Sequence, residues 1–185
     1  LQESLNDIEF DILTFCSKSI SQKISAFTIY ERLKSIRKIS KDKLYKSFDS
    51  LIAKNYLHTL EKFEHPRATK KIYLCDISLK SALSVEKHFG RLFENMVYLE
   101  LVKSHIACYY DELIEFYIPS NGEIILCMPF SDERALFKKI EQIEAFIFTH
   151  GIEKITCVTM NTEGSISHPL SHVEMLPFDI WALGD

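Results

Sequence analysis

The sequence predicts an α/β chain, α+β overall, that divides into two domains at about residue 77. Helical patterns followed by a pair of strands fill the first part, whereas strands and long helices are interspersed in the second. The charge also changes between the two parts. Residues 1–80 contain 15 Lys and Arg against 10 Asp and Glu, and residues 81–185 contain 7 against 16, within a net charge of −4. This asymmetry favours a different partner for each part.

Three helical patterns occupy the beginning of the first part. Apolar residues recur every three or four positions between Asn6 and Lys18, after Thr28 and after Ser40. Thr28 with Glu31 predicts a capping box, and Ser40 predicts an N-cap. The side chains expected to face the core from these helices are Ile8, Ile12, Phe15, Ile29, Leu33, Ile36, Leu44, Phe48, Leu51 and Ile52.

Two strand patterns follow the third helix directly. They span residues 56–62 and 70–76 and are joined by a turn around His65, Pro66 and Arg67. Three short helices followed by a two-stranded hairpin is the order of a winged helix. The sequence therefore predicts a winged-helix domain over residues 1–77.

The second part, residues 78–185, begins with a helix that runs through Leu92 to Val102. Strands are expected at 106–111, 113–118, 123–128 and 154–160, and a helix capped by Ser131 and ended by Gly151 precedes the last of them. This order predicts a mixed sheet flanked by helices. Five phenylalanines at core spacings are expected to be buried, namely Phe89, Phe93, Phe116, Phe137 and Phe146.

Basic residues concentrate around the predicted third helix and the hairpin. In a winged helix the third helix enters the major groove and the hairpin contacts phosphates. Lysine suits phosphate contacts, so we expect salt-sensitive and sequence-tolerant binding of duplex DNA. The residues expected to bind nucleic acid are Lys34, Arg37, Lys38, Lys41, Lys43, Lys46, Arg67, Lys70 and Lys71. Docking of a protein partner is the alternative for the same domain.

Motifs for several other functions are missing from the sequence. It contains no G-x-x-x-x-G-K-[ST] phosphate loop, no G-x-S-x-G nucleophile motif and no C-x-x-C metal motif. The five cysteines are widely spaced and lie mostly in apolar runs, so we interpret them as reduced, which indicates the cytoplasm. Neither a membrane-spanning apolar run nor a signal peptide is apparent. Because the chain begins at Leu1 rather than Met, we expect it to be a piece of a longer protein.

Two segments carry a resemblance to a known family. The sequences KIYLCDISLKSAL, residues 71–83, and GRLFENMVYLEL, residues 90–101, resemble the C-terminal region of a family of bacterial and archaeal AAA+ ATPases. Members of that family have a P-loop ATPase module, a winged helix, and a C-terminal domain of uncharacterised function related to restriction-endonuclease-like nucleases. The resemblance covers nearly the whole chain, and its strongest motif is the helix with Glu94 and Asn95.

The resemblance implies a nuclease-like domain whose catalytic residues are lost. The family pattern has a helix Glu, then a strand with Glu-x-Asp-Phe, then a strand with Ile-Glu-x-Lys. Here Glu94 matches the first position, only Glu115 keeps a carboxylate in the second motif, and residues 123–130 lack the acid and the lysine of the third. Two carboxylates alone would bind Mg²⁺ poorly. We therefore expect vestigial Glu94 and Glu115, no metal, no cofactor in this chain, and no enzymatic activity; ATP and Mg²⁺ would belong to an ATPase module outside it.

The leading hypothesis is a non-catalytic module that binds DNA or a protein partner through its winged helix. On this hypothesis the nuclease-like domain acts as a scaffold. One alternative is a metal-dependent nuclease that uses Glu94, Glu115 and a displaced acid such as Glu112 or Glu123. A further alternative is a purely structural domain that forms a homo-oligomer.

Overall fold

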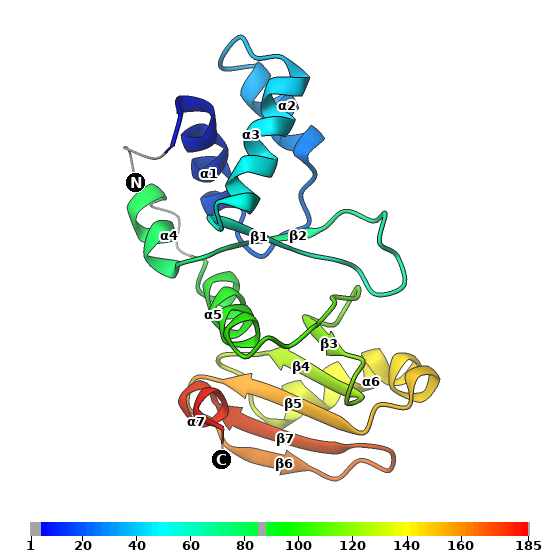
Figure 1. Ribbon diagram of the computed structural model, residues 1–185. Coiled ribbons are helices and arrows are strands. Elements are labelled where there is room, and N and C mark those ends of the chain that lie inside the picture. The colour runs from blue at the N-terminus through cyan, green and yellow to red at the C-terminus, as the bar shows by residue number, and fades with distance from the viewer. Residues whose placement is uncertain (1–4, 85–87, 185) are drawn as a thin grey trace. The chain divides into compact units, whose positions relative to one another are not determined.

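Helices and strands occur together along the whole chain in the computed structural model, which describes residues 5–84 and 88–184 (Figure 1). The described residues form seven helices, one two-stranded sheet and one five-stranded sheet, so the fold is α+β overall. They belong to two units. The first unit contains the residues up to Glu61 and then His65–Asn95, and the second contains Lys62–Glu64 and the residues from Met96 on.

The first unit combines four helices with an antiparallel hairpin in which Leu57 lies opposite Leu74. Its elements are α1 (Asp7–Lys18), α2 (Ala26–Lys34), α3 (Lys41–Ala53), β1 (Leu57–Leu60), β2 (Lys71–Leu74) and α4 (Ile77–Leu83). The hairpin loop, residues 61–70, joins β1 to β2. A single antiparallel bridge between Lys23 and Lys71 places the segment before α2 beside β2.

The helix starts are set by side-chain caps. Asn6 and Glu9 form a reciprocal capping box at α1, and Ser40 caps α3 as the sequence predicts. The predicted start of the second helix is wrong, because Ser25 rather than Thr28 is its cap and accepts a hydrogen bond from the Thr28 N–H. Because α2 ends at Lys34, Ile36 lies beyond it and is 79% exposed instead of buried.

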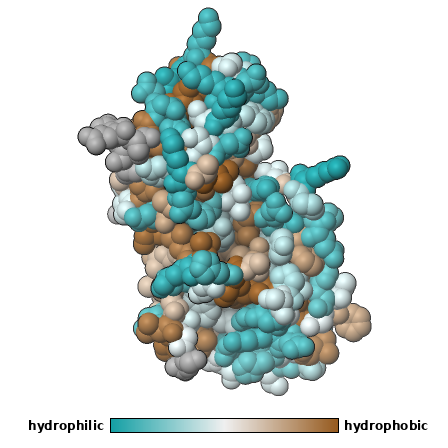
Figure 2. Space-filling model, viewed as in Figure 1, coloured by the Kyte–Doolittle hydropathy of each residue, from teal (hydrophilic) through white to brown (hydrophobic). Residues whose placement is uncertain are grey.

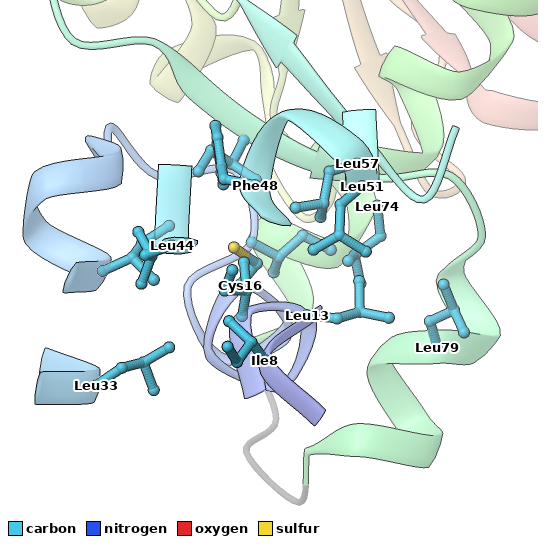
Figure 3. Packing of buried hydrophobic residues seen from close by; sticks show 14 residues of the cluster. Ile8, Leu13, Cys16, Leu33, Leu44, Phe48, Leu51, Leu57, Leu74 and Leu79 are labelled. Atoms are coloured by element: carbon cyan, nitrogen blue, oxygen red, sulfur yellow. The ribbon is translucent and has the colours of Figure 1, made fainter. Parts of the chain in front are cut away.

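The core of the first unit forms where all these elements meet. In Figure 3 the labelled side chains point toward one another from the helices and from the hairpin, with Cys16 among them. Leu79 of α4 belongs to this core, and α4 packs against α1. A boundary at residue 77 would therefore separate α4 from the core that it helps to form, and the structure divides the chain after Asn95 instead.

Glu9 ties α1 to α3 from a buried position. Its Oε1 accepts hydrogen bonds from Ser50 Oγ at 2.6 Å and from Lys54 Nζ at 2.8 Å, while Oε2 accepts one from the Asn6 N–H. Burial by itself raises the pKa of Glu9, but the hydrogen bonds from Lys54, Ser50 and Asn6 outweigh burial and hold the pKa below its ordinary 4.5.

A buried asparagine attaches the following helix, α5 (Phe89–Lys103), to β2. Asn95 Oδ1 accepts a hydrogen bond from the Leu74 N–H at 2.8 Å, and Asn95 Nδ2 donates to the Leu74 carbonyl at 3.0 Å. The side chain of Asn95 is 0% exposed. Its amide thus satisfies both backbone groups of Leu74, as a neighbouring strand would.

The sheet of the second unit is mixed. Its strands are β3 (Phe116–Ile118), β4 (Glu123–Cys127), β5 (Lys154–Thr159), β6 (Gly164–Ile166) and β7 (His172–Pro177), in the order β3-β4-β5-β7-β6. The three inner strands β4, β5 and β7 are parallel, and the edge strands β3 and β6 are antiparallel to their neighbours. The chain ends with α7 (Phe178–Leu183).

Helix α6 (Glu133–His150) packs on one face of this sheet. Its buried residues are Leu136, Ile140, Ile143 and Ile147, spaced by three or four positions. They meet alternate residues of the parallel strands such as Ile124, Ile155 and Val173. Gly151 ends the helix with φ +59°, as predicted, because that left-handed conformation strains residues with a Cβ. The predicted N-cap is wrong by one residue, since Asp132 rather than Ser131 accepts the hydrogen bond from Ala135 N–H.

Other predictions for the second part need correction. Residues 106–111 do not form a full strand. Two isolated bridges lie there instead, an antiparallel one between Tyr109 and Tyr117 and a parallel one between Tyr110 and Lys62. The expected burial of Phe93 and Phe116 is confirmed, whereas Phe89 and Phe137 are 40% and 50% exposed.

Phe63, from the hairpin loop, packs in an aromatic cluster of the second unit. Its ring meets those of Tyr117 and His150 edge-on, with centroid distances of 4.7 and 5.3 Å. The Phe63 N–H donates to the carbonyl of Tyr110 at 2.9 Å. Phe146 of α6 completes the cluster.

In the part of the chain that the structure describes, no helix is both long enough and apolar enough to cross a membrane.

We expect the Asn95→Leu variant to lose about 2–5 kcal/mol of unfolding free energy, because it leaves two buried backbone groups of Leu74 unpaired. Urea unfolding followed by far-UV circular dichroism measures this loss. Asn161→Leu, at an exposed position, is the matched control. A loss no larger than that of the control would show that the Asn95 amide does not hold α5 to β2.

The lowered pKa of Glu9 predicts a pH-dependent contribution to stability. The contribution is fully present above the unfolded-state pKa of about 4.5 and disappears as the pH falls through the lower folded-state value. Thermal unfolding of the wild type and of Glu9→Gln between neutral and acidic pH tests this. The stability advantage of the wild type should shrink as the solution is acidified, and an advantage that stays constant with pH would contradict the assignment.

Candidate nucleic-acid interface

Helix α3 presents three lysines on its exposed side. Lys43 and Lys46 are exposed and form no ion pair with any residue that the structure describes. Lys41 is also exposed, and its Nζ lies 5.3 Å from the ring centre of Phe27 and 5.6 Å from that of Tyr45. These rings hold the ammonium group in place without neutralising it. The three lysines have no ion pair among the described residues, and because Asp42 and Asp49 are also exposed on α3, the helix carries a small net positive charge.

Two further predicted cations are also uncompensated. Lys38, between α2 and α3, and Arg67, in the hairpin loop, are exposed and have no ion pair within residues 5–84 and 88–184. Arg67 lines a cavity of about 250 Å³ between the start of α2, β1 and the hairpin loop. The cavity wall includes Phe48 and Lys70 as well, so it is partly apolar and partly basic.

Three other predicted cations are compensated by acidic neighbours. Arg37 pairs with Asp11 and lies 3.8 Å from Asp7, so its charge is neutralised at the start of α1. Lys70 is 2.7 Å from Glu61 across the hairpin. The pair between Lys34 and Glu31 is looser, at 3.8 Å.

Lys71 does not lie on this surface, and the structure corrects its predicted role. It is only 9% exposed, and its Nζ is 2.8 Å from Oε1 of Glu94. The same oxygen accepts a hydrogen bond from the hydroxyl of Tyr73 at 2.8 Å. Lys71 and Glu94 thus form a largely buried pair between β2 and α5.

Glu115 is bound to α6 through Lys139. The two side chains are 3.6 Å apart, while the second oxygen of Glu115, Oε2, is buried and has no hydrogen-bond partner among the described residues. The charges of Glu115 and Lys139 both affect the pKa of the nearby Cys157 thiol. Burial, together with the charge of Glu115, raises the pKa of the Cys157 thiol to about 12, so this thiol stays protonated near neutral pH.

The predicted carboxylates each contact a lysine of their own unit. Glu94 belongs to the first unit and Glu115 to the second, and Glu112 accepts a hydrogen bond from Lys62 at 2.7 Å. Within residues 5–84 and 88–184, no three His, Cys, Asp or Glu side chains form a group that could hold a metal ion.

Glu123 belongs instead to a polar cluster that the sequence analysis missed. Strand register places Glu123, Thr156 and Glu174 on neighbouring strands of the sheet face opposite α6. Thr156 Oγ1 donates to Glu123 at 2.9 Å, and Lys154 Nζ lies 2.8 Å from Glu174. The alternation of these residues with the apolar core positions of each strand was the available signal.

The pKa shifts in this cluster follow from the same contacts. Burial by itself lowers the pKa of Lys154, but the hydrogen bond to Glu174 and the charge of Glu123 outweigh it and raise the pKa. Burial raises the pKa of Glu174, yet the hydrogen bond from Lys154 outweighs that effect and the pKa is lowered. Both groups are therefore held in their charged forms, as expected for a structural ion pair.

Comparisons of the chain with protein families, with curated proteins and with solved structures give no match.

The buried ion pair between Lys71 and Glu94 predicts a specific pattern of losses in unfolding free energy. Glu94→Leu should cost about 3–5 kcal/mol, because it leaves the Lys71 ammonium buried without its carboxylate. The double variant Glu94→Leu/Lys71→Met should recover most of that loss, because neither charge remains. Urea unfolding of the two single variants and the double variant measures the coupling. Losses that simply add would contradict a direct interaction between Lys71 and Glu94.

Proposed function

We propose that the chain is a non-catalytic nucleic-acid-binding module that contacts the backbone of duplex DNA through its first unit. The observation that carries the proposal is the set of exposed cations without acidic partners in the described structure, namely Lys38, Lys43, Lys46 and Arg67, with Lys41 fixed beside them. Uncompensated lysines on one helix attract phosphates and release bound counterions on association.

The order of the elements supports this assignment. Three helices, a β-hairpin and a short bridged segment before α2 follow one another as in a winged helix, in which α3 would be the recognition helix. Figure 2 shows hydrophilic side chains over much of the surface presented by α2 and α3. A hydrophilic surface of this kind suits a hydrated phosphate backbone better than an apolar partner.

The residue types indicate the mode of binding. Lysine makes point-charge contacts to phosphates, whereas specific base contacts most often use the forked donors of arginine or the amides of Asn and Gln. Four of the five cations in the proposed surface are lysines. We therefore expect sequence-tolerant binding that weakens steeply with salt.

The second unit would serve as a scaffold in this proposal. Two acids of the second unit that were considered for a nuclease site have partners there: Glu115 lies near Lys139, and Glu123 accepts a hydrogen bond from Thr156. In the first unit, Glu94 pairs with Lys71. These contacts give each carboxylate a structural role. The resemblance to AAA+ ATPases then makes the chain the C-terminal part of such an enzyme, and the five free cysteines suit the reducing cytoplasm.

Fluorescence anisotropy with a labelled duplex, measured across a salt series, tests the proposal. We expect Lys43→Glu/Lys46→Glu to weaken binding and to reduce the slope of log K against log salt by about two, one for each lost phosphate contact. Arg67→Ala should reduce the slope by about one.

The double variant Lys18→Glu/Lys103→Glu is the control, because it changes the net charge equally at exposed lysines outside the proposed surface. It should retain nearly the wild-type slope. No binding of the wild type at low salt, or an equal effect of both double variants, would overturn the proposal.

A further inference from the structure

The outer side of α6 carries an apolar groove beside the edge strand β6. Phe137 and Ile166 contribute its apolar surface, and four charged residues of α6 complete the wall of a groove of about 490 Å³. Phe137 is 50% exposed, although aromatic side chains are usually buried. The charged residues lining the groove are Glu133, Arg134, Lys138 and Glu141.

The charges of this helix face are not satisfied within the chain. Arg134, Lys138 and Glu141 are exposed and form no ion pair with any residue that the structure describes. Positions 134, 137, 138 and 141 lie on one helix face, because they are spaced by three or four residues. Both signs of charge therefore flank one exposed aromatic ring.

We propose that this face pairs with the same face of a second copy of the chain, with the two α6 helices antiparallel. A twofold axis between Phe137 and Lys138 brings each Arg134 opposite Glu141 of the other copy. The same axis places each Phe137 beside Lys138 of the other copy, where the ammonium can lie over the ring. The surface is thus complementary to itself in both charge and apolar contact.

Charge also selects this register over its closest rival. Phe148, 76% exposed, lies three turns beyond Phe137 on the same face. A register that paired Phe137 with Phe148 of the other copy would set Glu141 against Glu144 twice. Two like-charge contacts disfavour that arrangement, whereas the register centred between Phe137 and Lys138 has two opposite-charge contacts.

Glu133 is fixed at the rim of the groove rather than available for pairing. A Cβ on Gly164 of β6 would lie 2.9 Å from Oε1 of Glu133, so the carboxylate packs directly on the strand at that glycine. The proposed contacts therefore use Arg134 and Glu141, and they do not depend on DNA binding by the first unit.

Sedimentation velocity of the whole 185-residue chain over a range of concentrations tests the dimer. We expect Arg134→Glu to weaken dimerisation about tenfold or more, because two attractive pairs become two repulsive ones, and Glu141→Arg to do the same. An equimolar mixture of the two variants should recover the dimer, since each variant then supplies the charge that the other lacks. The double variant Arg134→Glu/Glu141→Arg should also dimerise.

The variant Glu153→Arg is the matched control, because it makes the same charge change at an exposed acid beyond the end of α6, outside both registers, and should leave dimerisation within about twofold of the wild type. All three substituted positions are exposed, and far-UV circular dichroism checks that each variant stays folded. A wild-type chain that stays monomeric at all concentrations would overturn the proposal. So would a dimer that the mixed variants fail to restore, or one that Glu153→Arg disrupts as strongly as Glu141→Arg does.

Discussion

The hydrogen bonds of Asn95 to both backbone groups of Leu74 are the constraint on which the rest of the structure depends. They fix the position of α5 against the hairpin at the residue where the division between the units falls. Before this point α5 gives Phe93 to the interior, and after it the same helix buries Val97 and Leu101. One helix thus supplies buried side chains to both units.

Both residues of the strongest motif in the family resemblance, Glu94 and Asn95, have structural contacts in this chain. Glu94 neutralises Lys71, and Asn95 completes the hydrogen bonds of β2. A carboxylate that is needed to neutralise a buried lysine is retained for stability whether or not any chemistry takes place. The presence of Glu94 in the sequence therefore carries less information about catalysis than the motif alone suggests.

Local signals were sufficient to predict much of the fold. The apolar spacing of α1, α3 and α6, the cap at Ser40 and the helix end at Gly151 depend only on neighbouring residues, and the structure has them where the sequence predicts. The start of α2 was missed because Ser25 and Thr28 are both good caps three residues apart. Strand β6 was hard to predict because it has only three residues and pairs only with β7, at the edge of the sheet.

The candidate site was predictable only in part, for a different reason. Acidic residues far away in the sequence determine which basic side chains are neutralised. Asp11 neutralises Arg37 across 26 positions, and Glu94 neutralises Lys71 across 23. A count of basic residues cannot distinguish these from Lys43 or Lys46. The exposed face of α6 was missed similarly, because helical spacing alone does not show whether Phe137 meets another element of the fold.

The path of the hairpin loop has a consequence for anyone who wishes to separate the two units. Because Lys62–Glu64 belong to the second unit while the residues on either side belong to the first, the chain crosses between the units three times. A gene cut after the codon for Asn95 would leave Phe63 on one fragment and its partners Tyr117 and His150 on the other. The C-terminal fragment would lack a ring from its aromatic cluster, and the N-terminal fragment would display that ring to water. Neither fragment would therefore reproduce the structure that its unit has in the whole chain.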